Sequence, residues 1–195
     1  MNHIAILGAG PGGYVAAIRA AQLGARVTVI ENQALGGVCL NWGCIPSKAL
    51  LSVVELGDKA KKAKDFGIQL GGPVTYDPAV MVARKNKVVA TLVKGIATLF
   101  KTWNIEHVEG TGELLDARTI RVTKPDGTET RVVADGVIIA ASDADSVREV
   151  LAGASAKVES YGFRDGAVWR VSDVAFDPEG TQFTVWRRDE RVARV

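Results

Sequence analysis

Cysteine and histidine are scarce in this sequence, and their scarcity argues against two classes of small protein. The chain has two cysteines and two histidines in 195 residues. Two cysteines are too few for the disulfide framework that holds small secreted domains together. A closed zinc site needs four ligands, and neither His3 nor His107 has a neighbour in the sequence that could serve as one. We therefore expect neither a disulfide-stapled scaffold nor a structural zinc site.

Strong charge and targeting patterns are also lacking. The formal net charge is +2, so the sequence gives no electrostatic reason to expect a nucleic acid as partner. The first residues, "MNHIAILGAG", do not read as a signal peptide, and we find no apolar stretch that approaches the length needed to cross a bilayer. We expect a cytoplasmic protein without a membrane partner. In that compartment a close cysteine pair is more often catalytic or metal-binding than structural.

The first 141 residues show the alternation of strands and helices that is typical of an α/β fold. An apolar strand at 3–7, an alanine-rich helix at 14–23 and a β-branched strand at 26–31 form one βαβ unit. Two longer helices follow at about 46–64 and 77–103, the second opened by Asp77 and Pro78. The pattern then changes to short strands at 105–108, 119–123, 130–134 and 136–141. We predict a parallel sheet with long helices and a small β-meander.

A glycine-rich turn joins the first strand to the first helix. Gly8, Gly10 and Gly13 form the pattern G-x-G-x-x-G. The first glycine permits the tight turn, the second lets a diphosphate approach the backbone, and the third lets the helix pack closely on the strand. Glu31 ends the second strand 18 residues after Gly13, where a ribose-binding carboxylate is expected. The alternative is a glycine-rich turn of another α/β fold, but the arrangement favours a dinucleotide site.

Both cysteines lie in the stretch "GGVCLNWGCIPSK", residues 36–48. Cys39 and Cys44 could be unreactive buried thiols, half of a metal site or a redox-active pair. The shortage of histidine disfavours the metal site. Four intervening residues would let the thiols meet if a helix begins at Cys44, and a helix N-terminus with Lys48 nearby would lower the pKa of a thiol. The redox interpretation fits best.

The stretch "LGGVCLNWGCIPSKALL" resembles the active-site segment of the flavin-dependent pyridine nucleotide-disulfide oxidoreductases, and within them the dihydrolipoamide dehydrogenases. The later stretches "GTGELLDARTIRV" and "DGVIIA" extend the resemblance over residues 1–140. It implies a Rossmann-like domain that binds FAD over residues 1–141. The implied cofactor-binding residues are Gly8, Gly10, Pro11, Gly13, Glu31, Gly36, Gly37, Val38, Cys39, Cys44 and Lys48.

The same resemblance implies a catalytic role for three residues. Cys39 would be the thiol that exchanges with a dithiol substrate, Cys44 would face the flavin, and Lys48 would lie near the flavin ring and influence its electronics. The implied reaction converts dihydrolipoamide and NAD⁺ into lipoamide and NADH through a Cys39–Cys44 disulfide. Other small dithiols or disulfides are alternative substrates. The implied partners are 2-oxo-acid dehydrogenase complexes and a second copy of the chain in a homodimer.

The resemblance also marks what the chain does not contain. In the family the strand that corresponds to "VIIA" leads into Thr-Gly-Ser, whereas here Ala141, Ser142 and Asp143 follow. We find no second G-x-G-x-x-G in the sequence, and we expect the NAD domain and the interface domain with its His–Glu acid–base pair to be absent. We therefore expect negligible turnover of dihydrolipoamide with NAD⁺ by this chain alone. The alternative function is a non-catalytic fragment that binds FAD, or a chimera of misjoined pieces.

Residues 142–195 differ in character from the rest. We predict a small α+β piece with a short helix at 143–154, strands at 158–163, 167–177 and 181–188, and a turn at 177–180. The segment weakly resembles part of a Mur ligase such as UDP-N-acetylmuramate–alanine ligase, on the cues "VREVL", "YGF" and "DPEGTQFTV". An unrelated β-rich extension is an equal alternative. No phosphate-binding loop is present in the segment, so the ligase activity is not carried over.

Overall fold

The structure is a computed structural model of the whole chain, and it describes residues 1–139, 161–162, 169–177, 180–187 and 190–194. The chain separates into two compact units, Met1–Val150 and Leu151–Val195, which we describe one by one. The boundary that we predicted near residue 141, the Ala141-Ser142-Asp143 departure and the predicted helix at 143–154 lie outside the described residues. The mixed α/β class expected from the sequence is confirmed.

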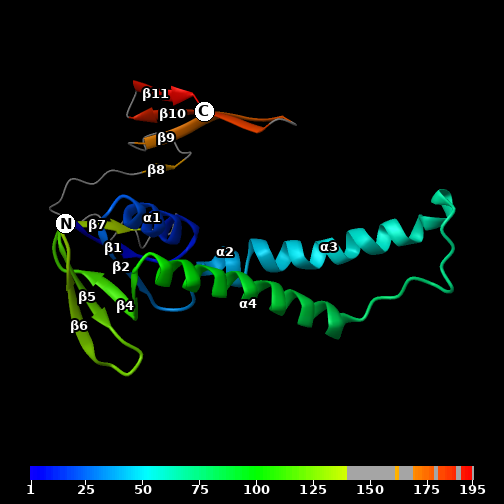
Figure 1. Ribbon diagram of the computed structural model, residues 1–195, viewed down its shortest axis with the longest axis horizontal. Coiled ribbons are helices and arrows are strands. Elements are labelled where there is room, and N and C mark those ends of the chain that lie inside the picture. The colour runs from blue at the N-terminus through cyan, green and yellow to red at the C-terminus, as the bar shows by residue number, and fades with distance from the viewer. Residues whose placement is uncertain (140–160, 163–168, 178–179, 188–189, 195) are drawn as a thin grey trace. The chain divides into compact units, whose positions relative to one another are not determined.

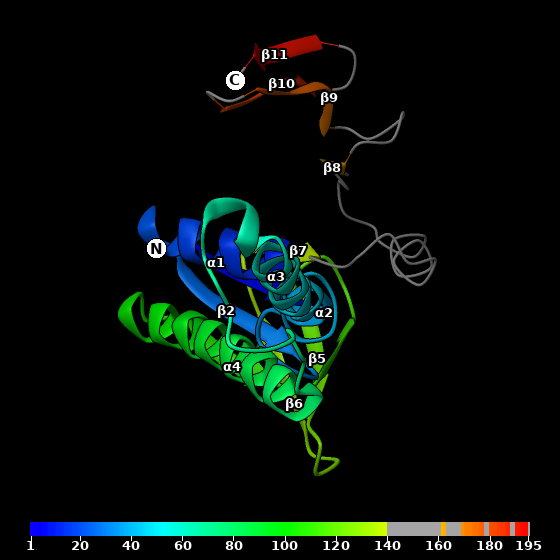
Figure 2. The same cartoon turned by 90° about the vertical axis from the view of Figure 1, so that its right-hand side faces the viewer.

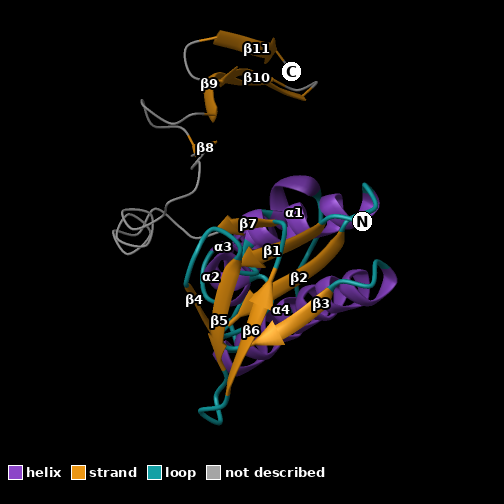
Figure 3. Cartoon of the chain, turned by 90° about the vertical axis from the view of Figure 1, so that its left-hand side faces the viewer, coloured by secondary structure: helices purple, strands orange, loops and turns teal. Residues whose placement is uncertain are grey.

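A parallel four-stranded sheet forms the centre of unit 1 (Figure 3). Its order is β3-β2-β1-β7, made of β1 (His3–Leu7), β2 (Arg26–Glu31), β3 (Glu106–Glu109) and β7 (Gly136–Ile139). In its register β1 pairs with β2 from His3↔Arg26 to Leu7↔Ile30, and with β7 from Ile4↔Gly136 to Leu7↔Ile139. The N-terminal strand is therefore central, with partners on both sides.

Each face of the parallel sheet is covered by a different layer (Figure 2). On one face, α1 (Pro11–Gln22) and α4 (Pro78–Thr102) cover a core that includes Ile6, Val29 and Phe100. On the other face lies the antiparallel meander β4 (Thr111–Leu114), β5 (Thr119–Thr123) and β6 (Glu129–Val133), with Ile120 and Val122 fully buried. Alternate residues of the central strands feed the two cores, as period-2 strands require.

A long helical arm extends from the sheet (Figure 1). It is made of α3 (Cys44–Lys61), the short 3₁₀ helix η1 (Ala63–Phe66) and the N-terminal part of α4, which packs against α3. The Asp77 side chain caps α4 by accepting from the N–H groups of Ala79 and Val80, at 2.9 and 3.1 Å. This confirms that Asp77 and Pro78 open the helix, because a capping carboxylate and a first-turn proline both favour a helix start.

The segment between β2 and α3 holds a short helix that the sequence analysis did not predict, α2 (Gly37–Asn41). Among the described residues, one helical stretch, Gly37–Lys61, is long and apolar enough to cross a membrane, judged by length and composition alone. We had not expected such a stretch from the sequence. Gly43, at φ −120° and ψ −109°, interrupts it between α2 and α3. The α3 portion also carries five charged side chains: Lys48, Glu55, Asp58, Lys59 and Lys61. This pattern favours one half of a helical hairpin over a membrane span.

Unit 2 is a four-stranded sheet in the order β11-β10-β9-β8. Its strands are β8 (Tyr161–Gly162), β9 (Trp169–Asp177), β10 (Gly180–Arg187) and β11 (Glu190–Arg194). β9 and β10 pair antiparallel with a register irregularity between Gln182 and Thr184, whereas β8 pairs parallel with β9. The strands that the sequence predicted around 167–177 and 181–188 are present, and β11 was not predicted.

Candidate functional site

The glycine loop follows β1 and leads directly into α1. Gly8 has φ +99°, a conformation that side chains rarely adopt, and its N–H donates to the carbonyl of Ile30 at 2.8 Å. Gly10 is the residue before the helix, and among the described residues no atom lies within 4 Å of the position that a side chain on it would take. Pro11 occupies the first helical position and Gly13 is buried beneath the loop. The loop therefore presents bare backbone and an uncapped helix N-terminus.

The Glu31 side chain lies against this loop. Its Oε2 accepts from the N–H of Ala9 at 2.8 Å, and its Oε1 accepts from the N–H of Gln33 at 3.0 Å. Ala9 is fully buried. Both oxygens of the predicted ribose-binding carboxylate are thus engaged with backbone donors, and one of them lies against the glycine loop.

The start of α2 packs directly on the glycine loop. The N–H of Gly36 donates to the carbonyl of Ala9 at 2.8 Å. Gly37 has φ +59°, and a Cβ on it would lie 2.8 Å from the Cα of Gly10. Real Cβ atoms are not found so close to a backbone atom, so the approach of α2 to the loop requires glycine at this position. Gly36 and Gly37 thereby join the glycine loop to the helix that carries Cys39.

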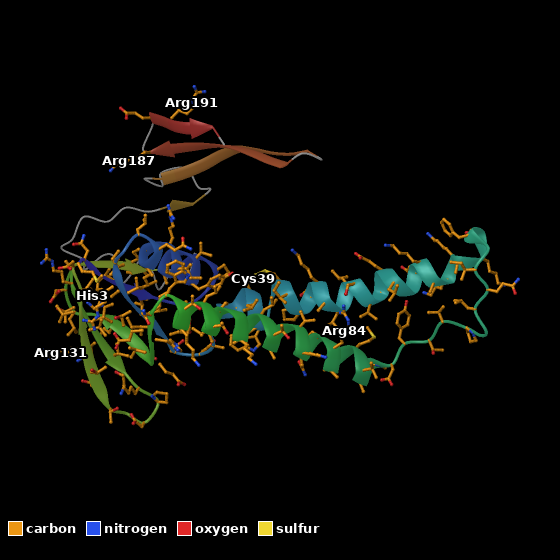
Figure 4. The ribbon with its side chains drawn as sticks, in the orientation of Figure 1. His3, Cys39, Arg84, Arg131, Arg187 and Arg191 are labelled. Carbon is orange, nitrogen blue, oxygen red and sulfur yellow. A yellow bond between two sulfur atoms is a disulfide. The ribbon has the colours of Figure 1, made fainter. Side chains whose placement is uncertain are left out.

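Cys39 and Cys44 form a disulfide with their Cα atoms 4.8 Å apart. Cys39 lies in α2 and Cys44 is the first residue of α3, so the bond links the two helices where they meet (Figure 4). Gly43 allows the close turn between them: a Cβ there would be 3.1 Å from the carbonyl oxygen of Val38 and 3.3 Å from the Cα of Cys39. Of the three interpretations of the cysteine pair, the bonded pair is the one observed.

The N-terminus of α3 differs from that of α2 in a way that matters for the thiols. α3 has 18 residues and no side-chain cap at Gly43, whereas α2 has five residues. A long helix concentrates positive potential and unbonded N–H groups at its first turn, which stabilises a thiolate at Cys44. Lys48 is one turn further along the same face and exposed, and within the described residues its side chain has no ion pair.

Apolar side chains flank the disulfide on the surface. Val38 is 68% exposed and Trp42 is 59% exposed, and the two are joined by a hydrogen bond from the Trp42 N–H to the Val38 carbonyl at 2.8 Å. Cys44 is exposed and Cys39 is half-buried. Cys44 is thus exposed together with two apolar residues that lie close to it in the sequence.

One residue of the site that the sequence analysis missed is Asn41. Its Nδ2 donates to the carbonyls of Leu35 and Gly37, both at 3.0 Å, and so ties the segment before α2 to the helix. Its place between the two cysteines was the available signal. Ala9 was also missed, because an alanine between glycines carries no chemical signal of its own.

The two histidines lie away from the cysteines in the structure. The ring of His107 meets the ring of Phe100 edge-on, with centroids 6.5 Å apart. Partial burial lowers the pKa of His107, against the opposing charges of Glu109 and Glu31. His3 Nε2 lies 2.9 Å from the hydroxyl of Thr28. Within the described residues, no group of three or more histidines, cysteines and carboxylates could hold a metal ion.

These features define a class: an α/β domain in which a disulfide-bearing helix packs on the glycine-rich turn between the first strand and the first helix. Residues 2–161 match the family described as pyridine nucleotide-disulphide oxidoreductase, and the chain belongs to this family. The family resemblance drawn from residues 35–51 is thereby confirmed.

Several curated relatives are named dihydrolipoyl dehydrogenase. The chain is 48% identical over 143 residues to the dihydrolipoyl dehydrogenase of Mycobacterium bovis, covering 72% of this chain and 30% of that protein. It is 42% identical over 137 residues to the one from Chlorobaculum tepidum, covering 70% and 29%. Among solved structures, LpdA from Mycobacterium tuberculosis is similar with a TM-score of 0.66 and 29% identity, covering 71% of this chain and 31% of LpdA. The chain spans about 30% of the length of these relatives.

Proposed function

We propose that this chain binds FAD at the glycine loop and that its Cys39–Cys44 disulfide accepts electrons from a small dithiol. The observation that carries the proposal is the joint between Gly37 and Gly10, which places the disulfide-bearing helix directly on the loop that would hold the cofactor diphosphate. A redox pair and a dinucleotide loop in contact can act on one electron path. The family supports the same reading, since its relatives include a flavoprotein disulfide reductase by title, RclA from Escherichia coli.

The residues present fit a dinucleotide. Gly8 and Gly10 leave backbone without side chains at the turn, and the N-terminus of α1 offers N–H groups and the positive end of the helix dipole to a diphosphate. Glu31 would accept from ribose hydroxyls, since each carboxylate oxygen has a lone pair beyond the one already used. Pro11, Gly13, Gly36 and Val38 remain predicted neighbours of the cofactor. When bound, FAD supplies the two-electron acceptor for the reduced cysteine pair.

The thiol chemistry follows from where the two sulfurs lie. A thiolate of the dithiol attacks the Sγ of Cys39, the Cys39–Cys44 bond breaks, and Cys44 leaves as a thiolate. Cys44 is the better leaving group because the long helix α3 stabilises negative charge at its first residue. In the resulting mixed disulfide, the first sulfur of the dithiol is bonded to the Sγ of Cys39. The second thiolate of the dithiol then attacks that first substrate sulfur, which closes the product disulfide and releases the Cys39 thiolate. The dithiol is oxidised by two electrons and loses two protons, and the protein disulfide is reduced by the same two electrons.

Two flanking features suit a dithiol substrate with an apolar chain. Val38 and Trp42 present exposed apolar surface beside the disulfide, against which an alkyl chain would bury area. Lys48 adds a positive charge one turn after Cys44 and would favour the thiolate at that position. We therefore propose dihydrolipoamide as the dithiol, in agreement with the name of the relatives.

We extend the proposal from this step at the disulfide to the complete reaction. It passes the electrons to NAD⁺ and takes place in a homodimer that serves 2-oxo-acid dehydrogenase complexes. The relatives are more than three times as long as the matched portion of this chain. The reaction at Cys39–Cys44 is the part that the residues of this chain would perform.

The test is a visible absorption spectrum of the purified chain after incubation with FAD and gel filtration. We expect a flavin spectrum, and one equivalent of dihydrolipoamide should add a long-wavelength band as the reduced Cys44 thiolate contacts the bound ring. The Cys44→Ser variant should retain FAD without the band, whereas Cys39→Ser should show it without dithiol. A chain that stays colourless would overturn FAD binding. A coloured chain without the band would show a non-catalytic FAD-binding protein, the alternative that the sequence left open.

A further inference from the structure

The backbone N–H of Ala9 lies at the tightest point of the glycine loop and is buried. Ala9 has no exposed surface, so its N–H has no access to water. The carbonyl of the same residue is satisfied by the Gly36 N–H, and the next N–H back along the chain, on Gly8, donates to the carbonyl of Ile30. The Ala9 N–H has one partner in the structure, the Oε2 of Glu31 at 2.8 Å.

A buried N–H without a partner costs free energy, since it has given up its hydrogen bond to water. In this loop the backbone cannot provide the partner, because the chain turns from strand to helix at Gly8 and Gly10. The Glu31 carboxylate supplies it from the end of β2. Its other oxygen accepts from Gln33 at 3.0 Å, which fixes the side chain from the opposite side.

We propose that Glu31 is a positioning residue that holds the glycine loop in its binding conformation before any cofactor arrives. The loop is tied by three hydrogen bonds from different directions: Gly8 to β2, Ala9 to the Glu31 side chain, and Gly36 to Ala9. Only the second depends on a side chain. The inference rests on the proposed function for the purpose of the loop, but the brace itself acts in the empty chain.

A carboxylate does this better than an amide. Glutamine has one acceptor oxygen and one NH₂ donor group, so it can satisfy Ala9 or Gln33 but not both. The other N–H would then face an NH₂ donor. Glu31→Gln therefore keeps the size of the side chain and removes one of the two backbone bonds, which separates bracing from packing.

The experiment uses the full chain without FAD. Thermal unfolding and amide hydrogen exchange at Ala9 are compared in the parent, Glu31→Gln, Glu31→Ala and the control Glu109→Gln. Glu109 pairs with Glu31 in the register of β2 and β3, is exposed, and has no side-chain hydrogen bond within the described residues. Loss of the brace should lower Tm on the order of 5 °C in both Glu31 variants. Exchange at Ala9 should accelerate about tenfold or more in Glu31→Ala, and exchange at one of the two amides, Ala9 or Gln33, should do so in Glu31→Gln. Glu109→Gln should change neither Tm nor these exchange rates.

A second measurement keeps the proposal testable if the Glu31 variants do not fold. In the parent chain, NMR should detect a scalar coupling across the hydrogen bond from the amide nitrogen of Ala9 to the side-chain carboxyl carbon of Glu31. Absence of this coupling, or slow exchange at both Ala9 and Gln33 in Glu31→Gln, would overturn the brace. Failure of the parent to take up FAD would overturn the proposed function and leave the brace intact, because these readouts need no cofactor.

Discussion

The approach of Gly37 to Gly10 yields the sharpest quantitative prediction. In Gly37→Ala the new Cβ would lie 2.8 Å from the Cα of Gly10, and the residue would keep φ +59°. A left-handed conformation costs a non-glycine residue about 1–2 kcal/mol. Forcing a methyl group into a close-packed contact costs about 1–3 kcal/mol more. We expect the free energy of unfolding to fall by about 2–5 kcal/mol.

Gly24→Ala is the matched control for the contact. Gly24 also has a positive φ, +86°, but no atom lies within 4 Å of the Cβ that it would gain. Its substitution should cost only the conformational part, about 1–2 kcal/mol. The difference between the two variants therefore isolates the contact between α2 and the glycine loop.

Urea unfolding followed by far-UV circular dichroism measures both losses, and FAD titration measures their effect on the site. Gly37→Ala should weaken FAD binding because it pushes α2 off the loop, whereas Gly24→Ala should leave binding unchanged. Equal losses of stability in the two variants would refute the reasoning, since they would show that the loop moves aside without cost. Unchanged FAD affinity in Gly37→Ala would refute the link between loop and cysteine helix.

Further predictions concern the arm, the cysteines and the pH. A Cβ on Gly57 would clash with the Tyr76 ring, so Gly57→Ala should destabilise the parent chain. In a Tyr76→Ala background the clash is gone, and Gly57→Ala should stabilise the chain by roughly 0.5–1 kcal/mol through helix propensity. A double-mutant cycle in which the effect of Gly57→Ala has the same sign in both backgrounds would contradict this. The Cys39–Cys44 bond closes a very short loop, so its reduction should lower the free energy of unfolding in urea by only about 2 kcal/mol. A much larger loss of stability would contradict the loop-entropy account. With the reduced protein and a small disulfide as probe, mass spectrometry should find a mixed disulfide trapped in Cys44→Ser and far less in Cys39→Ser; the reverse pattern would exchange the two roles. Because the pKa of His107 is lowered in the folded chain, the unfolded chain binds its proton more readily, and the free energy of unfolding should fall as the pH drops through 6.5 toward that lower pKa. His107→Gln should remove this part of the pH profile, and identical profiles would contradict it.

Much of unit 1 was predictable because its signals are local. The strand at 3–7 and the strand at 26–31 match β1 and β2 residue for residue, since short runs rich in apolar and β-branched residues carry a local strand signal. The helix expected from residue 14 begins three residues earlier, at Pro11, because proline and glycine are tolerated in the first turn. The long helix expected at 77–103 runs from Pro78 to Thr102.

The missed elements depend on contacts between distant residues. β4 contains Gly112 and reads as a loop, but it pairs with β5 from Thr111↔Thr123 to Leu114↔Ile120. α2 begins with glycine and spans one turn, which carries no periodic signal, and its position is set by packing on Gly10. The glycine loop, the acid and the cysteines were readable because their chemistry restricts the residue type, whereas the bond from Glu31 to Ala9 required the geometry.

The central place of β1 has a consequence for the growing chain on the ribosome. β1 finds β2 within the first 31 residues, but its other neighbour, β7, begins at residue 136. At about 5–20 residues per second, the intervening 104 residues take roughly 5–20 s to make. Throughout that interval one edge of the innermost strand presents unpaired N–H and carbonyl groups to any other strand nearby. A chaperone or the ribosome surface would protect this protein most effectively by covering a few apolar residues at its very beginning.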